Sequence, residues 1–167
     1  METVGTSFLI AGKGRKTMKK FLGFIVAACL LAPVAVQAMD TAVGSIKMVR
    51  GTSAIMRDMA AVETKNGTRI FRNDILKTGS DGSMSIVFRD DTLLALGPNS
   101  EFAIKEFLFS PAEGKLSIVT RLIRGTAVCI TGIIGKLSPQ SVRFETPVAN
   151  IGVRGTKFAV KVENPAE

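Results

Sequence analysis

The chain has 167 residues, of which 22 are Lys or Arg and 14 are Asp or Glu, so its formal net charge is +8. That length suits one domain. The sequence contains no His, Trp or Tyr. This excludes the usual general base, the usual zinc ligand and Ser-His or Cys-His nucleophiles, and leaves Phe as the sole aromatic residue. The composition therefore favours a binding or structural module over an enzyme.

The first element is an apolar segment near the N-terminus. Met18-Lys19-Lys20 precedes an apolar run over 21–32, and Val36-Gln37-Ala38 follows. This order of basic, apolar and small residues predicts a signal peptide over 18–38 that is cleaved after Ala38. Residues 1–17 are interpreted either as an extension of the basic region or as the result of a start codon placed too early, with Met18 as the natural beginning.

Two alternatives for this segment stay open. One is an uncleaved anchor, although a helix over 21–36 would span only roughly 24 Å of a hydrocarbon core about 30 Å thick. The other is a lipoprotein acylated at Cys29, because Val26-Ala27-Ala28-Cys29 resembles a lipobox. Cleavage after Ala38 would divide the chain into a leader over 1–38 and a domain over 39–167. Membrane contact would come only through the signal segment, if it is uncleaved.

Export changes the charge and the cysteine count. Cleavage after Ala38 would leave 17 basic and 13 acidic residues, a net charge of +4. The remaining basic residues are dispersed, which is typical of a solvated surface, so we expect no nucleic-acid partner. Cys129 would be the one cysteine left, and its neighbours Val128 and Ile130 favour burial over an intermolecular crosslink.

From Gly44 onward, apolar residues alternate with period two and turn signals recur about every ten residues. The predicted inward-facing sets are Met84, Ile86 and Phe88; Phe102 and Ile104; and Val142, Phe144 and Thr146. Predicted turns are a hairpin turn at Asn66-Gly67 and turns at 79–82, 97–100, 110–114 and 135–139. The pattern predicts an all-β domain, either a twisted two-sheet sandwich or a short β-solenoid-like stack of short strands, preceded by the signal helix.

An internal repeat accompanies these strands. Arg-Gly-Thr occurs at 50–52, 124–126 and 154–156, each time after an apolar residue and before an alternating segment. Gly suits a sharp corner before a strand, so the repeat suggests recurring corners. In the third copy Thr156, Phe158 and Val160 share a face. Transfer of this register predicts core positions at Thr52, Ala54 and Met56 and at Thr126, Val128 and Ile130.

These elements resemble the FecR domain family. Gly44-Ser45-Ile46 with Gly51 to Ala54 is similar to the opening strands of the family, and Asn73 to Gly79, Ser85 to Leu93 and Gly97 to Glu101 are similar to its next motifs. Phe144 to Phe158 is close to its "T-P…R-G-T-x-F" signature, which here consists of Thr146, Pro147, Arg154, Gly155, Thr156 and Phe158. The resemblance covers about 44–162. Asp91 stands where the family usually has Gly, which puts the turn type at Asp90-Asp91 in question.

The resemblance implies the periplasmic domain of a FecR protein. Sigma-regulating members carry a cytoplasmic segment before a membrane helix and a further signalling region after the domain. We expect the 17 residues before Met18 to be too few for such a segment. The resemblance therefore predicts a module without sigma-binding activity.

Candidate chemistry is sparse. A calcium site that joins Asp90 and Asp91 with Asp74 or Asp81 is one interpretation, but aspartate in turns is the commoner explanation. A row of Arg50, Arg124 and Arg154 would suit an anion such as phosphate or lipid A, against the alternative that each caps exposed carbonyls. A hydrolase that pairs Asp90 with a second carboxylate is not supported by the spacing.

The sequence therefore predicts a non-enzymatic, exported FecR-domain protein with no cofactor and no metal. We expect it to act in the periplasm or envelope as a protein-binding, signalling or assembly module. Its expected partner is an unidentified envelope protein, with self-association as a second option. The alternative function is a polysaccharide- or lipopolysaccharide-binding envelope protein. The strand after Arg154 is the first candidate contact, because an open strand edge accepts a partner strand.

Overall fold

The computed structural model describes residues 41–153 and 157–163. These residues form an all-β domain, as predicted. The signal segment, Ala38 and the boundary at 38/39 lie outside the described residues. The strands are β1 (Gly44–Arg50), β2 (Ser53–Arg57), β3 (Ala60–Val62), β4 (Arg69–Ile70), β5 (Ile75–Thr78), β6 (Ser83–Phe88), β7 (Leu93–Leu96), β8 (Glu101–Ser110), β9 (Lys115–Ile130), β10 (Val142–Glu145), β11 (Asn150–Gly152) and β12 (Lys157–Val162).

The strands pair into one curled sheet with two halves, which are named here half A and half B. Half A contains β4, β1, β6, β7, the C-terminal part of β9 and β12, in that order. Half B contains β3, β2, β5, β8, the N-terminal part of β9, β10 and β11. Every described pair is antiparallel except β10 with β9. This arrangement is closer to the predicted sandwich than to a solenoid of parallel coils.

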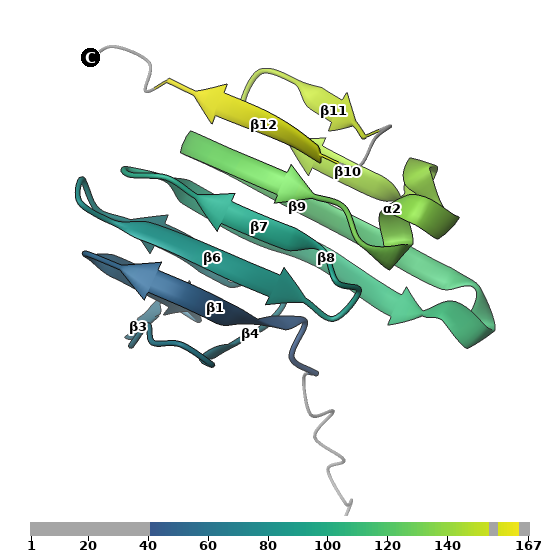
Figure 1. Ribbon diagram of the computed structural model, residues 1–167, viewed down its shortest axis with the longest axis horizontal. Helices are drawn as coiled ribbons and strands as arrows, with labels where there is room; N and C mark the ends of the chain where they lie inside the picture. Colours follow the sequence, from purple (N-terminus) through teal and green to yellow (C-terminus); the bar gives the residue numbers. More distant parts are fainter. Residues whose placement is uncertain (1–40, 154–156, 164–167) are drawn as a thin grey trace, which may run out of the picture. The chain divides into compact units, whose positions relative to one another are not determined.

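The two halves face each other across one hydrophobic core (Figure 1). The Phe88 ring of half A lies 5.7 Å from the Phe107 ring of half B, and the Phe144 ring of half B lies 5.4 Å from the Phe158 ring of half A. The predicted alternation is confirmed in the central strands. Met84, Ile86 and Phe88 are buried, and the residues between them are half-buried.

The β9 strand joins the halves. Its 16 residues pair with β8 up to Arg124 and with β7 from Ala127, so the strand passes from one half to the other at Gly125. Gly125 has a φ of +89°, which is accessible to glycine at little cost. A register shift opposite Glu101 and Phe102 accompanies the bend, and such a bulge increases the local twist.

The register transferred from the third Arg-Gly-Thr copy is wrong for the other two. In the second copy Ala127 and Cys129 are buried, whereas Ile130 is 38% exposed. In the first copy Ile55 is buried, and Ala54 and Met56 are half-buried. Strand pairing sets which side chains face inward, because directly opposite residues share a face. Cys129 lies opposite both Leu94 and Phe158, so Phe158 in the third copy is out of step with the first two by one residue.

Two turn predictions also need correction. Asn66-Gly67 forms a turn, with Thr68 N–H donating to Lys65 C=O at 3.0 Å, but it is not a hairpin turn. The flanking strands β3 and β4 pair instead with β2 and β1. Residues 135–139 lie largely in a short helix, α2 (Ile133–Leu137), and the start of a 3-10 helix, η2 (Pro139–Ser141). The predicted turn at 110–114 contains the 3-10 helix η1 (Pro111–Glu113).

The α2 helix depends on a distant turn rather than on local sequence signals. Asp90 C=O accepts a hydrogen bond from Ile133 N–H at 2.7 Å, and the Asp90 carboxylate accepts one from Ile134 N–H at 3.4 Å. Ile134 is fully buried in the core. A helix this short has little stability of its own, so these tertiary contacts hold it in place. Among the described residues there is no helix long and apolar enough to cross a membrane.

Candidate functional site

The Arg-Gly-Thr triplets mark the places where the chain passes between the two halves. The first lies between β1 of half A and β2 of half B, and the second is the bend within β9. The chain passes from β11 in half B to β12 in half A between residues 152 and 157. The third triplet, Arg154, Gly155 and Thr156, falls in this interval and lies outside the described residues. The predicted corners are therefore observed at the first two copies.

Glycine is required at both described corners because another loop packs directly against it. A Cβ atom on Gly51 would lie 2.3 Å from Asp81 C=O, and a Cβ atom on Gly125 would lie 2.3 Å from Ser100 Oγ. Both glycines also have positive φ, +62° and +89°. The loops that approach them, 79–82 and 97–100, are themselves passages between the halves.

A ladder of hydrogen bonds joins these four corners along one side of the domain. The carbonyl of Thr52 accepts from Gly79 N–H at 2.8 Å, and the carbonyl of Thr126 accepts from Gly97 N–H at 2.9 Å. Asn99 N–H in turn donates to Gly79 C=O at 2.9 Å. The two triplets therefore use their threonine carbonyls in the same way, each to hold the neighbouring corner.

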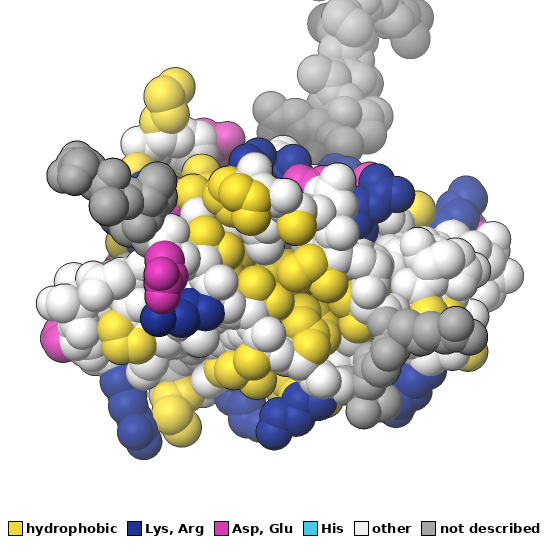
Figure 2. Space-filling view, turned by 90° about the horizontal axis from the view of Figure 1, so that it is seen from above, with side chains coloured by type: hydrophobic (Ala, Val, Ile, Leu, Met, Phe, Trp, Pro, Cys, Tyr) yellow, Lys and Arg dark blue, Asp and Glu magenta, His cyan; other side chains and the backbone are white. Residues whose placement is uncertain are grey.

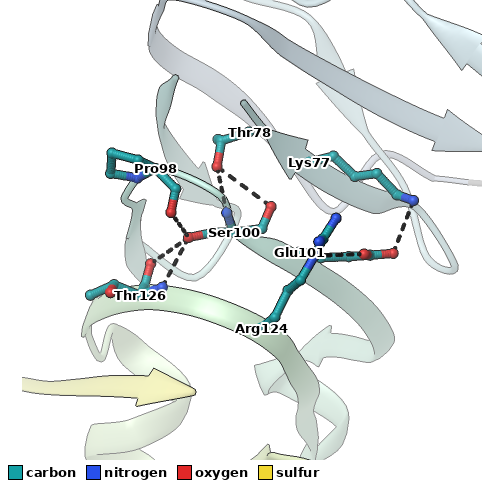
Figure 3. Close-up of polar contacts among 7 residues, drawn as sticks. All are labelled: Lys77, Thr78, Pro98, Ser100, Glu101, Arg124 and Thr126. Carbon is teal, nitrogen blue, oxygen red and sulfur yellow. Dashed lines mark hydrogen bonds and ion pairs between the residues drawn. The ribbon is translucent and has the colours of Figure 1, made fainter. Parts of the chain in front are cut away.

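Ser100 is the polar centre of this ladder (Figure 3). Its hydroxyl accepts from Thr126 N–H at 2.9 Å, and its own N–H donates to Thr78 Oγ1, also at 2.9 Å. The Thr78 hydroxyl donates to Gly97 C=O at 2.7 Å. Ser100 is 1% exposed, so its hydroxyl satisfies backbone groups inside the fold. A buried serine in this setting has a structural role.

Arg50 and Arg124, the two described members of the possible anion-binding row, do not form one cluster; Arg154 lies outside the described residues. Arg50 lies opposite Ser83 at the end of β1, and β6 and β7 separate β1 from β9. Three strand spacings place the ends of these strands about 14 Å apart. Arg124 forms an ion pair with Glu101 at 3.3 Å, and Glu101 also pairs with Lys77 at 3.0 Å (Figure 3). Arg124 is therefore already paired within the fold, where it shares the Glu101 carboxylate with Lys77.

Two of the aspartates considered for calcium, Asp74 and Asp90, have buried carboxylates with structural partners. The Asp74 carboxylate is fully buried and accepts two hydrogen bonds from Arg57, both at 2.8 Å. The Asp90 carboxylate is also fully buried and accepts from the Thr92 hydroxyl at 2.8 Å. In the described ranges, no three side chains of the metal-binding types group together. Asp91 has a φ of +63°, so it adopts the left-handed conformation that glycine usually provides.

Asp81, the last of the aspartates considered for calcium, stabilises the corner at Gly51 and Thr52. Its carboxylate accepts a hydrogen bond from Thr52 N–H at 3.2 Å. Hydrogen bonds from Thr52 stabilise the ionised form and lower the pKa of Asp81 below its ordinary value. The four aspartates are thus explained by turn, cap and corner geometry.

The described part of the signature builds a turn and the last strand. Thr146 N–H and Thr146 Oγ1 both donate to Ala149 C=O, at 2.8 and 3.0 Å, and close the turn between β10 and β11. Pro147 lies in this turn and is exposed. Phe158 is half-buried rather than buried, with its ring edge-on to Phe144. The described signature residues therefore shape the C-terminal end of the curled sheet.

The strand that follows Arg154 lies at a sheet edge. Among the described strands β12 pairs only with β9, and β11 pairs only with β10. Figure 2 views the domain from above relative to Figure 1, from the side where β11 and β12 lie. Hydrophobic side chains gather across the middle of this view. Ile151, Phe158 and Val160 are all half-buried and pack against the core. We call this region the C-terminal seam: the β12 edge with these three side chains.

Cys129 is buried, as the sequence predicted. Burial, with the nearby charge of Asp90, raises the pKa of its thiol to about 12. A buried thiol with this pKa is protonated at neutral pH and unreactive. Cys129 therefore behaves as a core residue.

Comparison with protein families gives a match to this chain. The FecR protein family matches residues 74–166, more than half of the chain. The matched range contains the buried Asp74 and Asp90, the Ser100 ladder and β12, whereas the opening strands from Gly44 precede it. Searches of curated proteins and of solved structures found no match. The chain therefore belongs to the FecR family, whose members are envelope-associated signalling and regulatory domains not known as enzymes.

Proposed function

We propose that this chain is an exported, non-enzymatic module that binds another envelope protein by accepting a strand at the free edge of β12. The family match supports an envelope-associated signalling role, and the position of β12 supports the binding mode. Alternate residues of an edge strand direct their backbone N–H and C=O groups away from the sheet, so they are available to a partner strand.

The side chains of β12 favour such an addition. Phe158, Val160 and Val162 face inward and pack against the core, but each keeps part of its surface exposed. A partner strand beside β12 would cover these apolar side chains and would extend half A by one strand. Burial of apolar surface contributes roughly 25 cal/mol per Å², which adds to the backbone hydrogen bonds gained. The half-buried C-terminal seam is the single observation that carries the proposal.

Photo-crosslinking in cells tests this contact. A photoreactive amino acid at Ala159 in β12 is expected to give a discrete adduct with an envelope protein. The same amino acid at Ala112, an exposed residue of η1, is the control and is expected to give none. Equal adducts at both positions, or none at Ala159, would contradict strand addition. An adduct with a cytoplasmic sigma factor would contradict the envelope role.

Export is a separate part of the proposal. A chain cleaved after Ala38 would begin at Met39, which the intact mass of the protein recovered from the periplasmic fraction measures directly. A mass that includes residues 18–38 would indicate an anchor, and an acylated Cys29 would indicate a lipoprotein. Either mass overturns cleavage at Ala38 but leaves the β12 contact unaffected.

A further inference from the structure

The outer face of half A carries an open groove that strand addition at β12 does not use. The groove has a volume of about 290 Å³. It is lined by Met48, Leu93, Ala95, Val128 and Ile130, with Lys47 and Ser85. Met48 is 46% exposed and Ile130 is 38% exposed. This face is turned toward the viewer in Figure 1, where β1, β6, β7, β9 and β12 lie side by side.

The pairing of short side chains in neighbouring strands produces the groove. Ser85 lies opposite Ala95, Ala95 opposite Val128, and Val128 opposite Ala159. Opposite residues share a face, so this row of short side chains crosses the sheet. Leu93 and Ile130 form the next row, and their longer side chains form one wall of the groove. At β1 a register shift between Ile46 and Met48 leaves both Lys47 and Met48 exposed.

The strands of this face carry basic side chains, and one of these, Lys161, is already paired with Glu163 just after β12 at 2.8 Å. The strands of half A contain no Asp or Glu, whereas Lys47 and Arg50 lie in β1 and Lys157 and Lys161 in β12. Lys157 lies opposite Ile130 and Lys161 opposite Thr126, so both β12 lysines extend from the face that carries the groove. Basic residues therefore stand at both ends of the row of short side chains.

The outer face of half B has a different character. Glu101 pairs with both Lys77 and Arg124, and Glu145 pairs with Lys105. Lys77, Arg124 and Lys105 are therefore paired with carboxylates of neighbouring strands. In half A, by contrast, Lys47 and Lys157 lie in strands that contain no carboxylate, and this basic charge favours an acidic ligand outside the chain.

The shape and charge of the groove select among possible occupants. Its volume is at the lower limit of small-molecule pockets, about 300–1,000 Å³, so it suits a few apolar side chains better than a whole ligand. A second copy packed face to face would bring like charges together, which is unfavourable. A flat bilayer surface cannot fill a recess. A polypeptide segment with apolar side chains and carboxylates satisfies both shape and charge.

We propose that the outer face of half A binds an acidic amphipathic segment of a partner protein. From β1 to β12 there are four strand spacings, which places the two basic ends about 19 Å apart. The segment therefore presents apolar side chains in its middle and carboxylates at both ends, separated by about 19 Å. A helix of about 13 residues has this length. Complementary charge at both ends fixes the register of the bound segment.

Peptide binding to the full chain tests the proposal. The probe is a synthetic helical peptide of about 13 residues with leucines on one face and glutamates at both ends. A second peptide carries lysines in place of the glutamates. The wild-type chain is expected to bind the glutamate peptide at least about tenfold more tightly. The double variant Lys47→Glu with Lys157→Glu is expected to reverse this preference.

A charge-matched control separates this face from net charge. Lys65→Glu with Lys136→Glu changes the same number of charges at exposed positions outside half A, and we expect it to keep the wild-type preference. Equal binding of both peptides by the wild-type chain, or the same loss in both double variants, would overturn the proposal.

Two other occupants have their own readouts. Binding to phosphatidylglycerol vesicles that the Lys47 and Lys157 changes abolish, without peptide binding, would assign the face to a membrane. A dimer that those changes dissociate would assign it to a second copy. Either result overturns the peptide proposal. Ala159 lies in the same row of short side chains, so crosslinking there is repeated in the double variant Lys47→Glu with Lys157→Glu. An adduct at the β12 edge is expected to persist in that variant, whereas an adduct with a segment on the outer face is expected to be lost, so failure of one proposal is distinguishable from failure of the other.

Discussion

The hydroxyl of Ser100 lies 2.9 Å from the backbone nitrogen of Thr126 and accepts its hydrogen bond. This contact joins the loop between β7 and β8 to the bend of β9. Ser100→Ala would leave the Thr126 N–H without this acceptor inside the fold. Such a loss typically costs about 1–3 kcal/mol of the free energy of unfolding. Urea denaturation measures the change, and Ser80→Ala at an exposed position of the neighbouring corner is expected to stay within about 0.5 kcal/mol.

Gly125→Ala tests whether the close packing of the corners is required. Gly125 and Gly67 have nearly the same φ, +89° and +86°, but a Cβ on Gly67 would meet nothing within 4 Å. Alanine at either position is strained by about 1–3 kcal/mol because of its positive φ. At Gly125 the clash with Ser100 adds roughly 1–3 kcal/mol of overpacking. Gly125→Ala should therefore lower the urea midpoint clearly more than Gly67→Ala, and equal midpoints would contradict this packing.

Phe158→Ala tests the inward face of β12. Phe158 contacts the Phe144 ring and is half-buried, so we expect a loss of about 2–3 kcal/mol, below the 3–5 kcal/mol of a fully buried phenylalanine. Lys157→Ala, one residue away on the outer face, should change the free energy of unfolding by less than about 0.5 kcal/mol. Similar effects of the two substitutions would mean that the assigned faces of β12 are wrong.

Alkaline pH tests the environment of Cys129. The pKa of its thiol rises from 9.0 to about 12 on folding. Between these values the folded state holds a proton that the unfolded state releases, so the free energy of unfolding falls as pH rises from about 9 to 12. The contribution is fully present below pH 9. Cys129→Ala is expected to flatten the decline in this window, as measured by urea denaturation at several pH values. An unchanged slope would contradict a protonated core thiol.

Strand periodicity predicted much of the central sheet, and the corners only in part. Ile86 and Phe88 alternate with polar or half-buried neighbours, and this local pattern is sufficient to assign their inward face. The faces of Ala127 and Cys129 were predicted wrongly, because they follow from pairing with β7 and β12 across long sequence separations. Helix α2 was missed for the same reason: its contacts to Asp90 come from another hairpin.

The sequence indicated the signature region around β12 but not the groove on the outer face of half A. Three residues of the signature fall outside the described residues. The other three lie in the turn between β10 and β11 and in β12, so they shape the last strands of the domain. The groove of half A was not predicted, since its lining comes from strands far apart in sequence. A signal was nevertheless present in Leu93 to Leu96 and Ala127 to Ile130, where apolar residues stand at successive positions. Such runs indicate a strand with apolar side chains on both faces.

The passage of β9 through both halves has a consequence for how the domain opens. The same strand supplies the pairing partner of β8 in one half and of β7 and β12 in the other. Loss of β9 from either half therefore exposes the shared core of both. We expect the halves to behave as a single cooperative unit rather than as two foldons. Proteolysis in either half should then report one and the same free energy of global unfolding.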